Sequence, residues 1–308
     1  MLTYLVIILD DTSVSYCHYS PRKTEHKLIG LDDLKEGIKF AMKENLNIQF
    51  VYPSYFLPKE YREVIETIDH TKIGPISCGE ELDVVVIDDL SLNDAKYKNC
   101  LWRCSINELT RKQTEVIDVL SKVQRFNIVL TDILAWKEDA FVSYNSFLDK
   151  LVDAVVEQFS RGNPIQVNVL TDRLMIEEMN NCNAGDTSIT LASDGRFYVC
   201  PGYFGKQSVG SLEEGLSISN QQLFRLDHAP ICRKCDAFQC KRCVWMNEMS
   251  TLECNTPSHE QCVVAHLERR ASCKLSKLLQ LRGVSVENSY PIEEINYLDP
   301  FNILNKWN

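Results

Sequence analysis

An ordered series of cysteines constrains this chain more than any other feature of its sequence. Nine of its thirteen cysteines lie between Cys182 and the last residue, and seven of these nine are regularly spaced. The seven are Cys182, Cys200, Cys232, Cys235, Cys240, Cys243 and Cys262. The middle four form two C-x2-C pairs separated by four residues, which brings four thiolates within reach of a metal centre. The sequence therefore predicts that the C-terminal third of the chain folds around metal.

The number of cysteines bears on the kind of metal. A single zinc ion takes four ligands, which would leave Cys182, Cys200 and Cys262 unexplained. Seven ordered cysteines suit two four-ligand centres with one ligand absent or supplied by another group. Iron–sulfur is therefore the first interpretation, zinc the second, and buried thiols or disulfides the third. Four basic residues of the cysteine loop (residues 232–243) would offset the charge of a thiolate cluster: Arg233, Lys234, Lys241 and Arg242.

Composition and charge exclude several classes of protein. A net charge of −10 disfavours nucleic-acid binding, which needs a basic face. The apolar residues 1–9 are few, and Asp10 and Asp11 follow them, so they are predicted to form a buried first strand and not a secretory signal. No apolar run reaches the roughly 18 residues of a membrane span. The chain is expected in the cytoplasm, where reducing conditions favour metal binding by thiols over disulfides.

The first 170 residues alternate short apolar runs with amphipathic runs. Strands are expected at residues 4–9, 48–52, 82–87, 100–104, 126–130 and 165–169. Helices are expected at residues 31–44, 58–69, 107–123 and 144–159. This alternation predicts an α/β fold with a mainly parallel sheet, either a partial barrel or an open doubly wound sheet. No glycine-rich phosphate loop follows these runs, so nucleotide binding has no support.

The pattern changes near residue 170. The runs at 188–192 and 196–200 flank Asp194-Gly195, a dipeptide typical of a hairpin turn with positive φ. A loop region is expected from Pro201 through the cysteine loop, and then a helix at residues 258–281 with Ser258 as its N-cap. The predicted domains are therefore residues 1–172, a cysteine-rich domain at 173–282, and a C-terminal strap at 283–308.

The cysteine series resembles the seven-cysteine SPASM domain of radical S-adenosylmethionine (SAM) enzymes that modify peptides. Twelve residues separate Cys182 from Gly195, four more precede Cys200, and the cysteine loop and Cys262 follow, although the gaps within this loop are shorter than the usual ones. The resemblance implies two auxiliary [4Fe-4S] clusters. It assigns Cys182, Cys200 and Cys243 to the first cluster, which keeps an open or non-cysteine fourth position. It assigns Cys232, Cys235, Cys240 and Cys262 to the second.

The N-terminal part resembles a radical SAM barrel that has lost its own cluster. Such barrels carry C-x3-C-x2-C after the first strand, with an aromatic residue before the third cysteine. Here Cys17 takes the third position and Tyr16 the aromatic one, but Asp10 and Val14 stand in the first two. Of the family's Gly-Gly-Glu-Pro-like segment, only Pro53 matches. The resemblance implies a partial (β/α)6 radical-SAM-like barrel without SAM binding or cleavage; the alternative is an unrelated α/β domain with Cys17 as a core thiol.

Four segments are similar to the CXXX-repeat peptide maturases, which are associated with radical SAM systems acting on peptides that repeat cysteine at every fourth residue. The segments are residues 200–204, 244–247, 255–258 and 265–269. This resemblance implies a cysteine-rich (CXXX-repeat) precursor peptide as partner, and a radical SAM enzyme as a second one. His266 and Arg269 lie one turn apart on the expected helix, where a solvated face or a supporting contact is favoured over catalysis.

Three functions remain open from the sequence. The first is a component of a peptide-modification system that binds clusters and precursor peptide without cleaving SAM. The second is a stand-alone enzyme that uses an open auxiliary cluster, and the third is a zinc-stabilised binding module. The remaining cysteines carry less information. Cys78, Cys100 and Cys273 are expected to be buried thiols, Cys254 is an alternative ligand, and the Cys100-x3-Cys104 spacing is taken as coincidence.

Overall fold

The structure, a computed structural model, describes residues 2–15, 17, 24–87, 90, 98–175, 182–237, 240, 243–286 and 289–292. The chain divides into two compact units, and neither is continuous in sequence. Unit 1 comprises Met1–Asp88, Asn99–Arg103 and Asn183–Gln222; unit 2 comprises Asp89–Lys98, Cys104–Cys182 and Leu223–Asn308. Among the described helices, none combines the length and the apolar character needed to cross a membrane.

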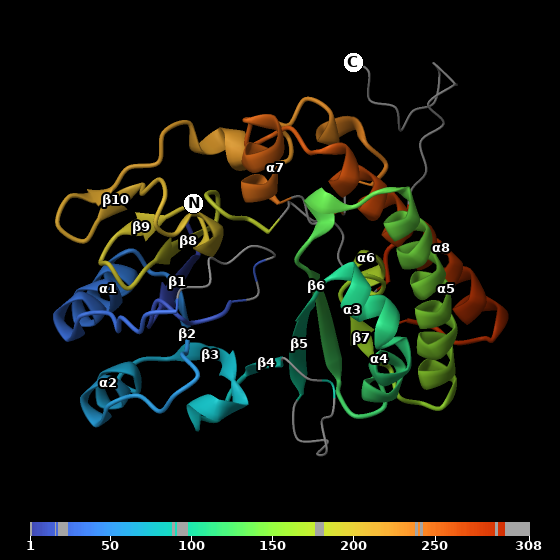
Figure 1. The fold of residues 1–308 in the computed structure, drawn as a ribbon, viewed down its shortest axis with the longest axis horizontal. Helices are drawn as coiled ribbons and strands as arrows, with labels where there is room; N and C mark the ends of the chain where they lie inside the picture. The colour runs from blue at the N-terminus through green and yellow to red at the C-terminus, as the bar shows by residue number, and fades with distance from the viewer. Residues whose placement is uncertain are drawn as a thin grey trace. The chain divides into compact units, whose positions relative to one another are not determined.

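Unit 1 is built on a mainly parallel sheet with the strand order β5-β4-β3-β2-β1-β8-β9 (Figure 1). The strands are β1 (Tyr4–Ile8), β2 (Asn47–Val51), β3 (His70–Pro75), β4 (Val84–Ile87), β5 (Asn99–Cys104), β8 (Ser188–Leu191) and β9 (Phe197–Tyr198). Only the β8–β9 hairpin is antiparallel among these pairs. The predicted hairpin is confirmed, with Gly195 at φ 75° in its turn. A second, two-stranded sheet joins β10 (Gly210–Ser211) to β11 (Gly215–Leu216).

Helices α1 (Leu31–Lys43) and α2 (Lys59–Ile65) belong to unit 1. Helix α1 buries Leu34, Gly37, Ile38 and Ala41, which fall on one face at helical spacing. This face packs on side chains of β1 and β8, and a Cβ at Gly37 would lie 2.4 Å from Leu191 Cδ2. The core of unit 1 thus joins the first strand of the chain to a hairpin almost two hundred residues later.

Strand β3 was not predicted from the sequence. Its residues, HTKIGP, include only one strongly apolar side chain, and they carry a glycine and a proline that disfavour strands. It forms because it pairs with β2 on one side and β4 on the other, with Gly74 beside Tyr52. The six strands that were predicted within the first 170 residues are confirmed to within a few residues.

Unit 2 contains the parallel pair β6 (Arg125–Leu130) and β7 (Gln166–Val167). Its helices are α3 (Ile106–Arg111), α4 (Gln113–Val119), α5 (Glu138–Ser160), α6 (Asp172–Met175), α7 (Val244–Thr251) and α8 (His259–Leu281). The single helix predicted at residues 107–123 was wrong: the chain bends at Lys112 and forms α3 and α4. Helix α7 was not predicted from the sequence. Helix α8 and its Ser258 N-cap are confirmed, and α5 and α8 lie side by side (Figure 1).

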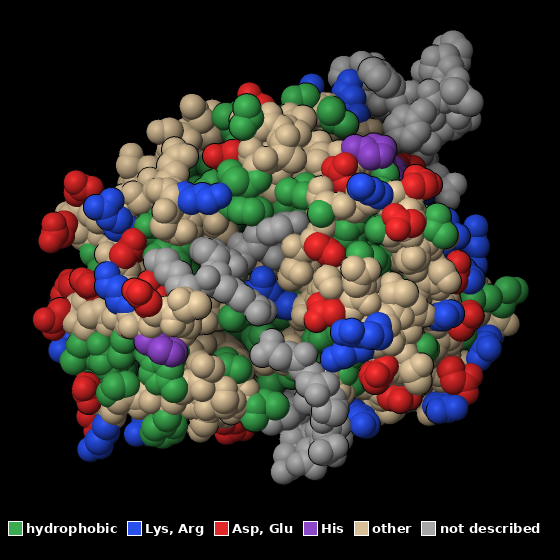
Figure 2. All heavy atoms as spheres, in the orientation of Figure 1, with side chains coloured by type: hydrophobic (Ala, Val, Ile, Leu, Met, Phe, Trp, Pro, Cys, Tyr) green, Lys and Arg blue, Asp and Glu red, His purple; other side chains and the backbone are tan. Residues whose placement is uncertain are grey.

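Charged side chains are mixed over the visible face of the molecule. Figure 2 shows acidic and basic groups interspersed there, and among the described residues neither sign gathers into an extended area. The predicted strap at residues 283–308 lies mostly outside the described residues, and the domain boundaries at residues 172 and 282 remain predictions.

The close approach of β3 to β2 yields a stability prediction. Gly74→Ala should destabilise the protein by about 1–3 kcal/mol, the usual range for overpacking a tight interior. The added Cβ would lie 2.8 Å from Tyr52 Cβ, which cannot move away without shifting its strand. Urea unfolding would measure the change, with Glu81→Ala at an exposed position as a control expected to stay within about 0.5 kcal/mol of wild type. Equal stability of Gly74→Ala and wild type would contradict this packing argument.

Candidate metal centre

The seven cysteines of the series are distributed over both units. Cys200 belongs to unit 1, whereas Cys182, Cys232, Cys235, Cys240, Cys243 and Cys262 belong to unit 2. The set of Cys182, Cys200 and Cys243 therefore draws on both units, and its assignment to one cluster remains a prediction. The set that the resemblance assigns to the second cluster lies within unit 2, where its surroundings can be described.

The cysteine loop begins with a tight turn. Cys232 opens a 3-10 helix, η5 (Cys232–Lys234), and its carbonyl accepts a hydrogen bond from the Cys235 amide at 3.1 Å. The Cys235 sulfur in turn accepts a hydrogen bond from the Ala237 amide at 3.3 Å. Backbone N–H groups directed at a thiolate stabilise its negative charge, as they do around metal-bound cysteines. Cys232 itself is buried against Leu226 and Ala229.

Helix α8 brings a second part of the site to this loop. Its N-cap is fixed by the Ser258 side chain, which accepts a hydrogen bond from the Gln261 amide at 3.3 Å. Cys262 and His266 follow, one turn apart and therefore on the same face of the helix. Burial raises the pKa of Cys262 to about 11, with further contributions from the charges of Cys240 and Cys235. The loop thiols thus influence the ionisation of the helix thiol.

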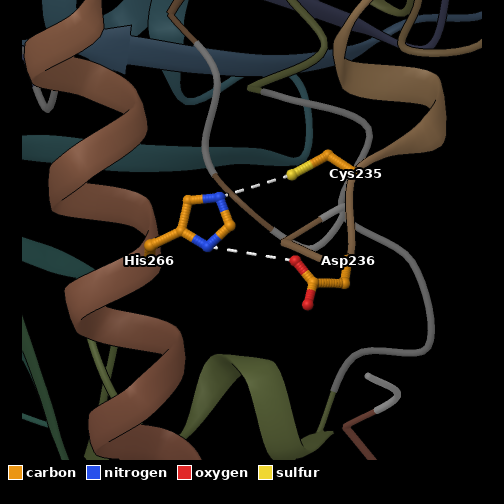
Figure 3. A group of neighbouring side chains, drawn as sticks. All are labelled: Cys235, Asp236 and His266. Atoms are coloured by element: carbon orange, nitrogen blue, oxygen red, sulfur yellow. Dashed lines mark hydrogen bonds and ion pairs between the residues drawn. The ribbon is translucent and has the colours of Figure 1, made fainter. Parts of the chain in front are cut away.

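His266 lies between a thiol and a carboxylate of the cysteine loop. Its Nε2 is 3.6 Å from Cys235 Sγ, and its Nδ1 is 3.9 Å from Asp236 Oδ1. Figure 3 shows the imidazole projecting from α8, with one nitrogen toward each of these groups. Contact with the Cys235 thiol is the main cause that raises the pKa of His266, and the charges of Cys235 and Asp236 add to it, while burial opposes it. The ligand atoms of these three residues lie within 4.8 Å of one another.

Asp236 is held in place by Arg269, one turn beyond His266 on α8. Arg269 Nε donates a hydrogen bond to the Asp236 carbonyl at 3.1 Å, and its Nη2 lies 3.4 Å from Asp236 Oδ2. The sequence singled out His266 and Arg269 and favoured a solvated face or a supporting contact over catalysis, but Asp236 was not identified from it. The signal was present in the spacing, because His266 follows Cys262 by one helical turn and Asp236 adjoins Cys235.

This part of the chain has the donor set of a metal site. Several thiols close together repel one another once ionised, which adds to the effect of burial in raising the pKa of Cys262. A bound cation removes that repulsion and holds thiols as thiolates. Among the described residues of unit 2, the ligand atoms that lie close enough together to share a metal ion are those of Cys235, Asp236 and His266.

Unit 1 contains a separate pair of thiols. Cys17 and Cys200 are hydrogen-bonded to each other, and this contact is the main cause that lowers the pKa of Cys17. The positive charge of Arg103 lowers it further, whereas burial raises it. Cys17 stands at the third position of the degenerate C-x3-C-x2-C motif, and the residue predicted as its aromatic neighbour, Tyr16, lies outside the described residues.

Asp10, at the first position of that motif, is enclosed by hydrogen bonds. Its side chain is fully buried after β1. Its Oδ1 accepts a hydrogen bond from the Thr12 amide at 2.9 Å, and its Oδ2 accepts one from the Tyr55 hydroxyl at 2.9 Å. His26 Nδ1 lies 3.4 Å from Oδ1. Both oxygens are therefore engaged by protein groups, and the alkyl side chain of Val14 offers no ligand at the second position.

The remaining cysteines agree with their expected roles in part. Cys78 and Cys100 are fully buried, and burial raises the pKa of Cys100 to about 11. Cys104 is buried as well, and burial raises its pKa. Cys273 is only half-buried, contrary to expectation. The Cys254 sulfur lies 3.9 Å from the Leu223 carbonyl, and its role as an alternative ligand remains a prediction.

The enclosed carboxylate of Asp10 yields a second stability prediction. Asp10→Ala should destabilise the protein by about 1–3 kcal/mol, because the Tyr55 hydroxyl and the Thr12 amide would lose their acceptor in a buried place. Asp10→Asn, which keeps one oxygen acceptor, should cost less. Chemical denaturation would compare both with Asp32→Ala, a control whose side chain is 98% exposed. A loss in Asp10→Ala no larger than that of the control would show that the network contributes nothing.

The comparisons with known proteins establish the fold. No protein-family model matches the chain, and no curated protein matches it in sequence. Among solved structures, a histidine-tagged form of anSMEcpe with bound AdoMet is 14% identical with a TM-score of 0.63, covering 93% of this chain and 97% of that one. Native anSMEcpe with bound AdoMet and Cp18Cys peptide is 14% identical with a TM-score of 0.61, covering 92% and 99%. The chain thus has the α/β fold of these AdoMet-bound proteins, which confirms the radical-SAM-like fold expected from its sequence.

Proposed function

We propose that this protein is a component of a peptide-modification system. In this proposal it binds a cysteine-rich, CXXX-repeat precursor peptide, holds metal in its cysteine series, and does not itself cleave SAM. The observation that carries the proposal is the group of Cys235, Asp236 and His266, whose ligand atoms lie within 4.8 Å of one another, on a fold like that of anSMEcpe bound to AdoMet and Cp18Cys peptide. Its abundant thiols suit a reducing compartment, and we therefore place it in the cytoplasm.

Iron–sulfur is the first choice of metal, by resemblance to the SPASM domain. The first set, Cys182, Cys200 and Cys243, provides three thiolates and leaves one position for another ligand. A thiolate of the peptide is well suited to that position, because it matches the other three in softness and charge. When bound, such a cluster would transfer electrons or would anchor the peptide through one of its irons. A partner radical SAM enzyme would then carry out the radical chemistry.

A second candidate is a zinc-stabilised peptide-binding module. The observation that favours it is His266, whose Nε2 lies 3.6 Å from the Cys235 sulfur, since imidazole is a common ligand of zinc and an uncommon one of iron–sulfur cubanes. Metal analysis separates the two candidates, because iron with acid-labile sulfide identifies clusters whereas zinc without sulfide identifies the module.

The peptide-binding proposal is tested with a synthetic CXXX-repeat peptide. Binding to the metal-loaded protein should weaken at least about tenfold, roughly 1.4 kcal/mol, when the peptide's cysteines are replaced by serine, because the hydroxyl is a poor ligand for a soft metal. Cys243→Ala should weaken binding of the cysteine peptide and leave binding of the serine peptide unchanged. Isothermal titration calorimetry would measure both.

The matched control for this experiment is Cys273→Ala, which removes a half-buried thiol of unit 2 outside the series. It should bind the cysteine peptide as wild type does. Equal affinity of wild-type protein for the two peptides would contradict the proposal that a peptide thiolate binds the metal. Failure to bind either peptide would remove the proposed partner.

The absence of SAM cleavage is tested directly. Iron-loaded protein reduced with dithionite should produce no 5′-deoxyadenosine above background, because Asp10 is engaged by protein donors and Val14 has no ligand atom. Chromatography of the reaction mixture would measure the product, with an active radical SAM enzyme as positive control. Formation of 5′-deoxyadenosine in proportion to protein concentration would overturn this part of the proposal.

A further inference from the structure

One face of helix α8 carries a short row of cations that lines a hollow in unit 2. The hollow has a volume of about 440 Å³, and the described residues that line it all belong to α8. They are Arg269, Arg270, Cys273, Lys274, Lys277 and Leu278. Because these residues recur at intervals of one helical turn, they form a single stripe along roughly three turns of the helix. We call this stripe the basic groove.

The neighbouring helix α5 neutralises only part of the charge of the basic groove. Arg270 Nη2 lies 3.5 Å from Asp149 Oδ2, and Lys274 Nζ lies 2.9 Å from Asp149 Oδ1, so two cations share one carboxylate of α5 (Figure 1). The hydrogen bond from Lys274 lowers the pKa of Asp149, which keeps this carboxylate ionised. Lys277 is exposed and forms no ion pair within the part of the chain that the structure describes. These three cations therefore face a single carboxylate.

The basic groove attracts an anion, although the chain as a whole is acidic. Its fourth cation, Arg269, is balanced by Asp236, whose Oδ2 lies 3.4 Å from the Arg269 Nη2. Four cations and two carboxylates leave an excess of two positive charges in the groove. The net charge of the whole chain is −10, so an acidic ligand is repelled by most of the protein and attracted to this place.

The uncharged parts of the basic groove favour a peptide over other anions. Leu278 and the thiol of Cys273 offer apolar contact, and the aliphatic stems of the lysine and arginine side chains add to it. A nucleic acid needs a broad basic face with many phosphate contacts, which four cations along one helix do not supply. Because a single exposed ion pair contributes little, several carboxylates on one ligand must act together. A peptide with both acidic and apolar side chains meets these requirements.

We propose that the basic groove binds an acidic segment of the precursor peptide, outside its cysteine repeats. Carboxylates of this segment contact Arg270, Lys274 and Lys277, and an apolar side chain of the segment lies against Leu278. The inference rests on the proposed function and adds to it a contact that involves no metal. Two contacts made by one peptide raise its affinity together. Cys273 brings no charge to the groove, so its replacement by alanine leaves this contact unchanged.

The charge of the ligand is tested first. The probe is a fluorescein-labelled, alanine-based peptide that carries glutamate and leucine and no cysteine, and its counterpart has glutamine in place of glutamate. Fluorescence anisotropy at low ionic strength should show that the full-length protein binds the acidic probe at least about tenfold more tightly than the counterpart. Added salt should weaken this binding, because it screens exposed charges. Equal affinity for the two probes would overturn the proposal.

Lys277 is the position that tests the groove itself, because its replacement breaks no ion pair among the described residues. Lys277→Glu should weaken binding of the acidic probe about threefold to tenfold, and Lys277→Arg should preserve it. The matched control is Lys43→Glu, which makes the same change of net charge at the exposed last residue of α1 in unit 1. This control should bind as wild type does. Equal weakening in Lys277→Glu and Lys43→Glu would show that net charge and not the groove governs binding.

Other occupants of the basic groove would give different results. The chain's own residues 293–308 include Glu293, Glu294 and Asp299. The combined variant Glu293→Gln, Glu294→Gln and Asp299→Asn should bind the acidic probe as wild type does, whereas binding by this variant alone would assign the groove to the C-terminal segment. A single-stranded oligonucleotide that binds more tightly than the acidic probe at the same salt concentration would also overturn the proposal.

The basic groove and the proposed function fail in different ways. A protein that binds the acidic probe through Lys277, but neither the cysteine-repeat peptide nor its serine form, would keep the groove as a site for acidic peptides and would remove the proposed partner. A protein that binds the cysteine-repeat peptide and not the acidic probe would overturn the groove and leave the proposed function standing.

Discussion

A buried ion pair fixes the position of helix α8, and the proposed metal ligands of unit 2 depend on that position. Arg173 is 2% exposed and its Nη2 lies 2.7 Å from Glu268 Oε2, while the Tyr144 hydroxyl donates to the other carboxylate oxygen at 2.8 Å. A buried pair adds little net stability compared with apolar packing, but either partner left alone is costly, by about 3–5 kcal/mol. The pair therefore selects one register for α8. Because His266 precedes Glu268 by two residues, this register sets where the imidazole meets the cysteine loop.

The sequence predicts the fold well where local signals are strong. Strands β1, β2, β4 and β6 are largely apolar runs, and Asp194-Gly195 marks its hairpin because only such a turn accepts positive φ easily. Strand β3 escaped prediction because its stability comes from pairing on both sides and not from its own side chains. The residues of the candidate site differ in the same way, because the cysteines are predictable from their spacing whereas their partners are not. Cysteine spacing identifies the loop. Asp236 and His266 become partners only when α8 packs against this loop, and the sequence of neither segment alone predicts that contact.

Asp10, at the carboxyl end of β1, has a structural role in unit 1. A cluster of the usual kind needs three thiolates at fixed spacing. Asp10 instead presents two oxygens, and both accept hydrogen bonds from groups of unit 1. These bonds offset the cost of burying the carboxylate, which would be high without them. Cys17 has likewise turned to another partner, the Cys200 thiol. The fold thus retains the framework of the AdoMet-bound proteins it resembles, while the residues at the motif serve the packing of unit 1.

Charge provides the last argument for a mixed ligand set in unit 2. Four thiolates around one divalent ion would leave two negative charges in a place where Asp236 is already buried, and concentrated like charge of this kind is unfavourable at low dielectric. A neutral imidazole in place of one thiolate reduces the excess to a single charge. Arg269 then neutralises Asp236, and the backbone amide of Ala237 supports the Cys235 thiolate. Asp236 is therefore balanced by His266 and Arg269, which lie one turn apart on α8.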